Sequence, residues 1–254
     1  MMPDRVSLVA RWVQEAPRVT VLTGAGISTE SGIPDFRGPQ GLWTKHPEKQ
    51  RLFTISTYLA DPEVRRQAWR ERLDHPAWSA RPGPGHRALA AFERTGRLRA
   101  LATQNIDGLH QAAGSDPALV LELHGTLHEA VCLSCGLRTP MGEVLDRVRG
   151  GEDDPACLAC GGVQKSATVS FGQALDPEIL EAAFLAAQTC ELFIAVGTSL
   201  TVTPAATLCD TAVRAGARLV IVNAEPTPYD RMAAVILSDP IGEVLPSILT
   251  TGTG

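Results

Sequence analysis

The chain has 254 residues, 44% of them hydrophobic, with a formal net charge of −5 and a pI of about 5.7. This length suits one large α/β domain, or a large domain with a small module. The sequence has no block rich in Lys and Arg, which argues against direct nucleic-acid binding. It also has no apolar run of about 18 residues, which argues against a membrane span. Residues 1–11 lack the pattern of a secretion signal, so we expect a cytoplasmic protein, with nothing demanding more than a monomer.

The predicted elements alternate between helices and strands. A helix covers 5–16 and a buried strand covers 19–23. A proline-rich stretch then predicts an insertion of loops and short helices over 36–84, including a helix at 62–73. The remaining elements are helix 85–94, strands 98–103 and 119–123, a second insertion at 128–168, helix 177–188, strand 192–196, helix 204–215, strand 218–222 and helix 241–249. This order predicts an α/β fold, a doubly wound, parallel, Rossmann-like sheet, with 1–254 as a single domain.

Four short polar strings follow apolar runs, at the points where strands should end. They are Gly24–Ser28, Gln104–Asp107, His124–Gly125 and Gly197–Ser199. Open α/β sheets bind ligands at the carboxyl ends of their strands. The four strings therefore predict a single cleft that binds a nucleotide and carries out chemistry on it.

Gly24 and Gly26 lie between a strand and an expected helix. Glycines at such a point let the backbone approach a pyrophosphate, and a helix N-terminus supplies free N–H groups. Ser28 or Thr29 can add hydroxyl donors. A tight structural turn is an equally good interpretation, because the third glycine of the usual fingerprint is absent. Glu225, after the last predicted strand, could bind ribose hydroxyls or cap a helix.

Four of the six cysteines form two matched pairs, Cys132 with Cys135 and Cys157 with Cys160, separated by 21 residues, while Cys190 and Cys209 lie outside this pattern. Four thiolates in two C-x-x-C pairs suit a closed tetrahedral zinc site, which leaves no position open for catalysis. An insertion this small could hardly bury a core of its own, so the metal would supply stability. A redox-active pair is the alternative, and two matched pairs argue against it.

His124 follows an apolar run and is predicted at a strand end. Imidazole titrates near neutral pH and is the usual general base, although a lone histidine at a strand end is more often structural. Asn105 and Asp107 could fix a ribose and a carboxamide together, or they could cap the following helix. Phe36, after a Gly-Ile-Pro turn, could shield a reactive carbon from water.

Taken together, these strings resemble the sirtuin family in order and spacing over nearly the whole chain. The matching segments are Gly24–Arg37 (GAGISTESGIPDFR), Thr103–His110 (TQNIDGLH), Glu122–Thr126 (ELHGT), the two cysteine pairs, Gly197–Leu200 and Asn223–Pro226 (NAEP).

The resemblance implies removal of acyl groups from lysine side chains of proteins or peptides, with NAD and one structural zinc ion as cofactors. The acyl oxygen would attack the ribose carbon that bears nicotinamide. The products would be deacylated lysine, nicotinamide and O-acyl-ADP-ribose. His124 would act as general base on the ribose hydroxyls, while Asn105 and Asp107 would position the nicotinamide ribose and carboxamide.

The resemblance also implies which residues contact the cofactor. Phe36 would cover the reaction centre and Arg37 would lie on the cofactor loop. The implied contacts are Gly24, Ala25, Gly26, Ser28, Thr29, Asp35, Phe36, Arg37, Gln104, Asn105, Asp107, Gly197, Thr198, Ser199, Asn223, Ala224, Glu225 and Ile241.

The segment implied to pair with the substrate peptide departs from the family pattern. It reads TVSFGQ, with Val169, Phe171 and Gly172 as the implied contacts and Gln173 where the family usually has an acid. Main-chain pairing does not depend on that side chain. We therefore expect peptide binding to persist, with an altered peptide preference.

The residues implied in acyl preference also depart from the family pattern. Members that prefer acidic acyl groups carry a Tyr and an Arg three residues apart, and those places fall on Trp69 and Arg72. An Arg can bind a carboxylate, but the phenol is missing here. We expect chiefly deacetylation, with a preference for succinyl-type groups as the alternative.

Three other functions fit parts of the sequence. A mono-ADP-ribosyltransferase would use the same ribose carbon, but it would not need the hydroxyl activation that His124 offers. An NAD-dependent dehydrogenase with a zinc knob is disfavoured, because the third glycine is missing. An NAD-binding module without turnover is disfavoured by the presence of Asn105, Asp107 and His124.

Overall fold

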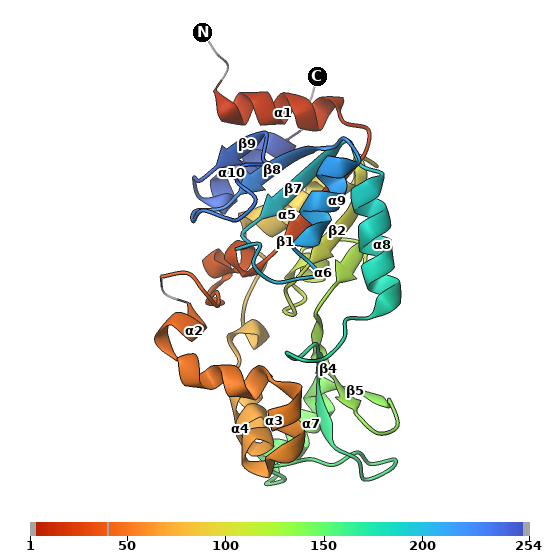
Figure 1. Ribbon diagram of the computed structural model, residues 1–254. Coiled ribbons are helices and arrows are strands. Elements are labelled where there is room, and N and C mark those ends of the chain that lie inside the picture. The colour runs from red at the N-terminus through yellow and green to blue at the C-terminus, as the bar shows by residue number, and fades with distance from the viewer. Residues whose placement is uncertain (1–3, 40, 251–254) are drawn as a thin grey trace.

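The computed structural model describes residues 4–39 and 41–250, which form a body built on a sheet and a smaller lobe at one end of it (Figure 1). Residues 1–3 of the segment inspected for a secretion signal lie outside the described residues. Among the residues described, no helix is long and apolar enough to cross a membrane.

The body is built on a six-stranded parallel sheet with the strand order β3-β2-β1-β7-β8-β9. All residues of β1 and β7 are buried, because helices cover both faces of the sheet. The strands are β1 (Val19–Thr23), β2 (Leu98–Thr103), β3 (Val120–Glu122), β7 (Leu192–Val196), β8 (Arg218–Val222) and β9 (Val235–Leu237).

Helices form one apolar layer on each face of this sheet (Figure 1). Successive strand side chains point to opposite faces, so Val21 belongs to one layer and Leu22 to the other. The first layer contains α1 (Arg5–Glu15), α5 (Pro84–Glu93) and α10 (Ile241–Leu249), and the second contains α8 (Pro177–Gln188) and α9 (Thr207–Arg214). The predicted doubly wound sheet is confirmed.

The strand order creates a switch point at the centre of the sheet. The chain runs outward from β1 through β2 to β3, then returns to the other side of β1 and runs outward again from β7. At such a point the loops that follow β1 and β7 diverge to opposite faces and leave a crevice between them. Gly24 follows β1 and Gly197 follows β7, so both lie at the crevice.

The lobe combines the two insertions. The first contributes the 3₁₀ turn Pro47–Phe53 and helices α2 (Leu42–Lys45), α3 (Ile55–Ala60) and α4 (Pro62–Leu73), with a further turn at Pro76–Trp78. The second contributes the antiparallel sheet β5-β4-β6 and helix α7 (Met141–Arg149). Its strands are β4 (Gly125–Cys132), β5 (Arg138–Pro140) and β6 (Gln164–Thr168).

The two insertions share one apolar core. Trp69 of α4, 1% exposed, packs with Ala130 of β4 and Met141 of α7. Arg65 also pairs with Asp154 at 2.8 Å across the same junction. The second insertion therefore buries apolar surface against the first insertion as well as against itself. The boundaries 36–84 and 128–168 themselves stay a prediction.

Some elements differ from the sequence expectations. The short strand β9 was not predicted from the sequence, because three residues give no usable periodicity. The helix expected at 204–215 begins at Thr207. The glycine turn leads into a 3₁₀ helix, Ala25–Ser31, and the helix after Asp107 is only α6 (Leu109–Ala112).

The four paired cysteines converge at the tip of the lobe. Their sulfur atoms all lie within 4.8 Å of one another, with Cys132 Sγ 3.5 Å from Cys160 Sγ and Cys135 Sγ 3.7 Å from Cys157 Sγ. A tetrahedral zinc with bonds of about 2.3 Å needs sulfurs about 3.8 Å apart. A Cβ on Gly162 would lie 3.1 Å from Cys132 Sγ, so the backbone itself closes around the sulfurs. The donor set fits a structural zinc ion.

The sheet core should tolerate truncation poorly. Leu101→Ala removes a fully buried side chain from β2 and should lower the free energy of unfolding by about 2–5 kcal/mol. Leu185→Ala, at a side chain that is 50% exposed on α8, is the matched control and should change it by less than about 0.5 kcal/mol. Urea titration measures both, and equal losses would contradict the assignment of Leu101 to the core.

The cysteine tip should depend on its metal. Cys132→Ser should abolish stoichiometric zinc, measured by mass spectrometry of the metal content, and should lower the melting temperature, because metal binding contributes to folding. Cys190→Ala, at a buried cysteine outside the cluster, should keep the zinc. Full zinc content in Cys132→Ser would refute the four-thiolate site.

Candidate active site

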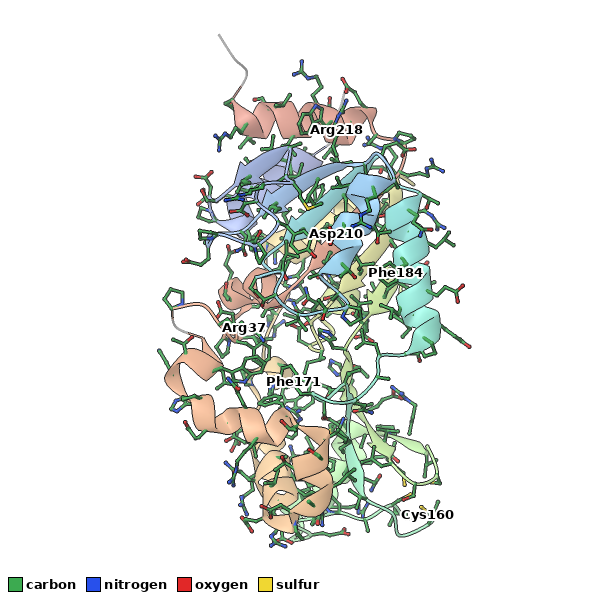
Figure 2. All side chains as sticks on the ribbon, in the orientation of Figure 1. Arg37, Cys160, Phe171, Phe184, Asp210 and Arg218 are labelled. Atoms are coloured by element: carbon green, nitrogen blue, oxygen red, sulfur yellow. The ribbon has the colours of Figure 1, made fainter. Side chains whose placement is uncertain are left out.

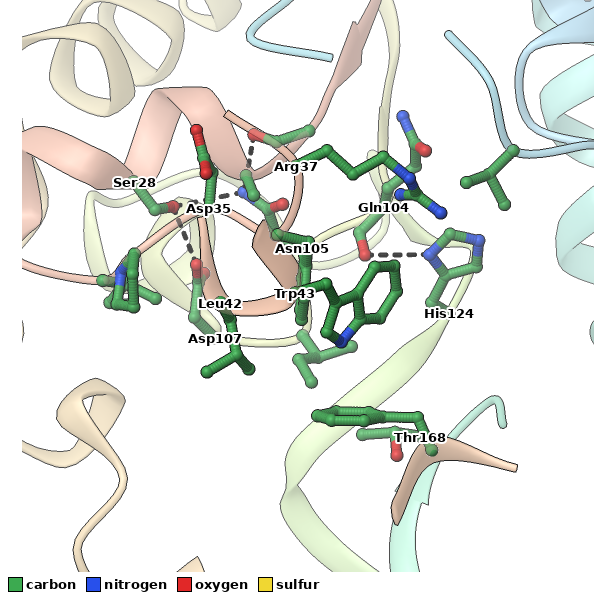
Figure 3. A pocket seen from close by; sticks show the side chains of 18 of the residues that line it. Ser28, Asp35, Arg37, Leu42, Trp43, Gln104, Asn105, Asp107, His124 and Thr168 are labelled. Carbon is green, nitrogen blue, oxygen red and sulfur yellow. Dashed lines mark hydrogen bonds between the residues drawn. The ribbon is translucent and has the colours of Figure 1, made fainter. Parts of the chain in front are cut away.

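A cleft of about 950 Å³ lies at the carboxyl ends of the central strands, between the body and the lobe. This volume is within the range of small-molecule and cofactor sites. Three of the predicted strings contribute side chains or backbone to it, and His124 of the fourth also lines it (Figure 3). The prediction that the four strings converge on one cleft is therefore confirmed.

Two glycine loops pack backbone against backbone at the switch point. Gly24 N donates to Val196 O at 2.9 Å and Gly26 N donates to Gly197 O at 2.8 Å. A Cβ on Gly26 would lie 2.7 Å from the Cα of Gly197, so a side chain at this position would collide with backbone. The glycines are thus required by the contact between the two loops, which lets both loops line the cleft.

Ser28, Asn105 and Asp107 form a buried hydrogen-bonded cluster at one side of the cleft (Figure 3). Ser28 Oγ donates to Asp107 Oδ2 at 2.8 Å, and Asn105 Nδ2 donates to Ser28 Oγ at 3.1 Å and to Gly24 O at 3.1 Å. Asp107 Oδ1 also accepts from Leu109 N at 3.0 Å. Asp107 therefore binds the first N–H group of α6 and also lines the cleft, while Gly108 is the N-cap of that helix.

Two buried histidines lie behind this cluster. His110 Nε2 lies 2.9 Å from Thr23 Oγ1, and burial lowers the pKa of His110 to about 3. His86 Nδ1 accepts from Gly83 N, and burial lowers the pKa of His86 as well. Both side chains are therefore neutral at pH 7. Sequence reasoning missed His86, although it lies on the buried face of α5 with Leu89.

His124 is held in one tautomer. Its Nδ1 lies 3.0 Å from the carbonyl oxygen of Gln104, which can only accept, so Nδ1 carries the proton (Figure 3). Nε2 is then unprotonated and can act as a base. Burial lowers the pKa of His124, and the Gln104 carbonyl partly offsets this effect.

The loop after the glycine turn carries an aromatic cluster. The Phe36 and Trp43 ring centroids are 4.7 Å apart, and Arg37 Cζ lies 4.6 Å from the centroid of Trp43. Burial lowers the pKa of Arg37. Trp43, which sequence reasoning missed, also packs on Phe171 at 5.4 Å. The sequence offered one signal for Trp43 as a site residue: it is a tryptophan in a segment without apolar periodicity.

The segment after β6 joins the body to the lobe. Val169 N donates to His124 O at 2.8 Å. Phe171 N donates to Phe53 O at 2.7 Å and Phe171 O accepts from Ile55 N at 3.0 Å. The segment thus runs along the cleft beside His124, and its residues Val169, Phe171 and Gly172 all line it.

Four predicted site residues do not line the cleft. Thr29 Oγ1 turns back to Gly26 O at 2.9 Å, and Ile241 packs against the first apolar layer. Ala224 is outside the lining, unlike its neighbours Asn223 and Glu225. Trp69 lies in the core of the lobe, whereas Arg72 reaches the cleft. All other predicted residues of the cofactor and substrate sets line it.

The cysteine cluster stands apart from this cleft. Cys160 lies at the far tip of the lobe, while Arg37 and Phe171 lie where the lobe meets the body (Figure 2). Among the residues described, the cysteine sulfurs do not line the cleft. A metal bound by these four thiolates would therefore act on the fold of the lobe.

Comparison with known proteins agrees with this geometry. Residues 24–204 match the model of the Sir2 family. The NAD-dependent protein deacetylase 2 of Streptomyces coelicolor is 54% identical over 92% of this chain and 97% of its own length. A solved structure that describes the mechanism and regulation of Sir2 enzymes is 40% identical, with a TM-score of 0.88 over 98% of this chain and 97% of that one.

A second solved structure adds a product. It is a Sir2 variant with a deacetylated peptide and 3′-O-acetyl ADP ribose, 35% identical, with a TM-score of 0.88 over 96% of this chain and 97% of that one. The matched family model spans more than half of the chain, and the relatives match it almost from end to end. With its glycine loops, its buried Asn105 cluster and His124 in one cleft, this chain belongs to the Sir2 family.

Proposed function

We propose that this chain is an NAD-dependent protein lysine deacylase, chiefly a deacetylase, that uses His124 as its general base. The observation that carries the proposal is the position of His124: its Nδ1–H is fixed on Gln104 O, in the same cleft as the Asn105 cluster and the segment after β6. The products would be deacylated lysine, nicotinamide and O-acyl-ADP-ribose. The substrate partners would be acyl-lysine peptides or proteins.

NAD would supply the ribose carbon that accepts the acyl oxygen as nicotinamide leaves. The residues that would hold it surround the cleft: Asn105 and Asp107 at the nicotinamide ribose and carboxamide, and Gly197, Ser199, Asn223 and Glu225 at the adenosine side. The Ser28 bridge between the Asn105 amide and the Asp107 carboxylate fixes both groups before any ligand binds. Phe36 would exclude water, with Trp43 behind it.

His124 would take a proton from a ribose hydroxyl through Nε2. Deprotonation of the hydroxyl creates the nucleophile that carries the acyl group away from lysine. The Gln104 carbonyl keeps the ring oriented and stabilises the imidazolium that forms, because it accepts from Nδ1–H in both protonation states. Since the His124 ring contacts the Gln104 carbonyl and no carboxylate among the described residues, it would act as base without a carboxylate partner there.

The other functions are less well supported. Trp69 lies in the core of the lobe and, of the two residues considered for acidic acyl groups, only Arg72 lines the cleft, where its Nη2 donates to Ser166 Oγ at 3.2 Å. No described contact favours transfer of ADP-ribose to a protein. The cytoplasmic location, the monomeric state and the lack of nucleic-acid partners stay predictions from composition.

Mass spectrometry of nicotinamide release, with and without an acetyl-lysine peptide, tests the proposal. Release that requires the peptide and yields O-acetyl-ADP-ribose would support it. Release that does not depend on the peptide, or ADP-ribose attached to protein, would contradict it.

His124→Ala should lower the rate of peptide-dependent O-acetyl-ADP-ribose formation from NAD by about 10²–10⁴-fold, because the general base is lost. Affinity for NAD, measured by calorimetry, should stay close to that of the wild type. His46→Ala, at an exposed histidine outside the cleft, is the matched control and should retain full activity. Product formation at the wild-type rate in His124→Ala would rule out the proposed base.

The pH dependence of kcat/KM should reflect the neutral form of His124. Since burial lowers its pKa below the ordinary 6.5, the base is present at neutral pH and is lost only as the pH falls through this lowered value. The acidic limb of the profile should therefore have its midpoint below pH 6.5. A midpoint above that value would contradict the buried, neutral imidazole.

A further inference from the structure

A buried lysine lies directly beneath the segment that follows β6. Lys165, in β6, is only 3% exposed, although it is the kind of residue that is almost never fully buried unless paired. No described carboxylate comes within ion-pair distance of its ammonium group. Burial, followed by the nearby charge of Arg72, lowers the pKa of Lys165 to about 8. This fold therefore keeps a costly charge in its interior.

The ammonium group donates three hydrogen bonds to the chain around the cleft. Lys165 Nζ donates to Ser166 O at 3.1 Å, to Thr168 O, and to Gln173 Oε1 at 3.4 Å. An ammonium has three N–H donors and no acceptor, so these three contacts use its full capacity. Two of the acceptors belong to the residues at the start and the end of the segment Thr168–Gln173.

Gln173 links the ammonium group of Lys165 to the turn that closes on Ser170. Its Oε1 also accepts from Ser170 N at 3.2 Å, and its backbone N donates to Ser170 O at 2.9 Å. The turn so closed contains Gly172, whose φ of +83° lies in the left-handed region. Gln173 Oε1 accepts hydrogen bonds from both Lys165 and Ser170. Loss of the ammonium group would therefore weaken the hydrogen bonding that holds the turn.

A second cation holds the other end of the segment. Arg72 Nη2 donates to Ser166 Oγ at 3.2 Å, and Ser166 Oγ lies 3.0 Å from Thr168 Oγ1. Thr168 lies on the opposite side of the cleft from Ser28 (Figure 3). The described backbone contacts leave Gly172 N and O without a partner, so the turn still has main-chain groups to offer.

From these contacts we infer that Lys165 is a positioning residue for the substrate peptide: its ammonium fixes the turn Thr168–Gln173 in the shape that pairs with the main chain of the acyl-lysine peptide. The inference rests on the proposed function. In this arrangement position 173 has to offer an acceptor oxygen, and Gln173 Oε1 accepts from both Lys165 Nζ and Ser170 N.

Steady-state kinetics with NAD and an acetyl-lysine peptide test this inference. Lys165→Met keeps the side-chain volume and removes the charge, and should raise KM for the peptide about tenfold, the effect of losing a charge-assisted hydrogen bond. KM for NAD and kcat should stay within about twofold, since no cofactor contact changes. A purely structural role would lower the amount of active enzyme and leave KM for the peptide unchanged.

Variants at Gln173 separate positioning from folding. Gln173→Met removes the shared acceptor and should raise KM for the peptide as Lys165→Met does. Gln173→Glu keeps an acceptor oxygen and should stay near the wild-type value. The Lys165→Met/Gln173→Met double variant should be no worse than either single variant, because both break the same contact. Lys45→Met makes the same chemical change on the surface, outside the cleft, and should behave as the wild type.

The outcomes separate this inference from the proposed function. If the wild type forms O-acetyl-ADP-ribose but Lys165→Met and Gln173→Met keep the wild-type KM for the peptide, the inference about Lys165 is wrong and the proposed function stands. If the wild type releases no nicotinamide in response to the peptide, both are wrong. If Lys165→Met does not fold, the two Gln173 variants decide the question by the same measurement.

Discussion

The close approach of two loop backbones is the constraint on which the site depends. The loop after β1 and the loop after β7 pack against each other through Gly26 and Gly197, at a separation that excludes any side chain. This contact exists because the sheet reverses its winding between β1 and β7. Both loops are fixed on buried strands. The groups that they carry, such as Ser28 after β1 and Ser199 after β7, are therefore held rigidly at one rim of the cleft.

The lobe supplies the other side of the cleft. Its core is shared between two segments far apart in the sequence, with Trp69 packed against α7, and the cysteine tip holds the far end of the second segment. The chain leaves this lobe through β6 and passes beside His124, where Val169 N binds His124 O. The stability of the lobe and the position of the segment that we assign to the peptide are therefore coupled through β6.

The polar groups around the cleft are buried at a cost in stability. Asp107 and Lys165 are each less than a tenth exposed and neither has an opposite charge bonded to it among the described residues, while His86 and His110 are buried in neutral form. Burial of such groups is tolerated only where hydrogen bonds satisfy them. Their concentration at the cleft is what a preorganised site requires, because its dipoles must be fixed before the reaction begins.

Much of this protein was determined by its sequence alone. The alternation of buried strands with amphipathic helices specified the doubly wound sheet, and two C-x-x-C pairs specified a four-sulfur site, because periodicity and ligand spacing are local properties. Tertiary structure alone decided that Trp69 belongs to the lobe core, that Ile241 faces an apolar layer, and that Lys165 reaches Gln173. Each of these depends on how segments far apart in the chain pack, and side-chain direction at such contacts is set by the neighbours that packing provides.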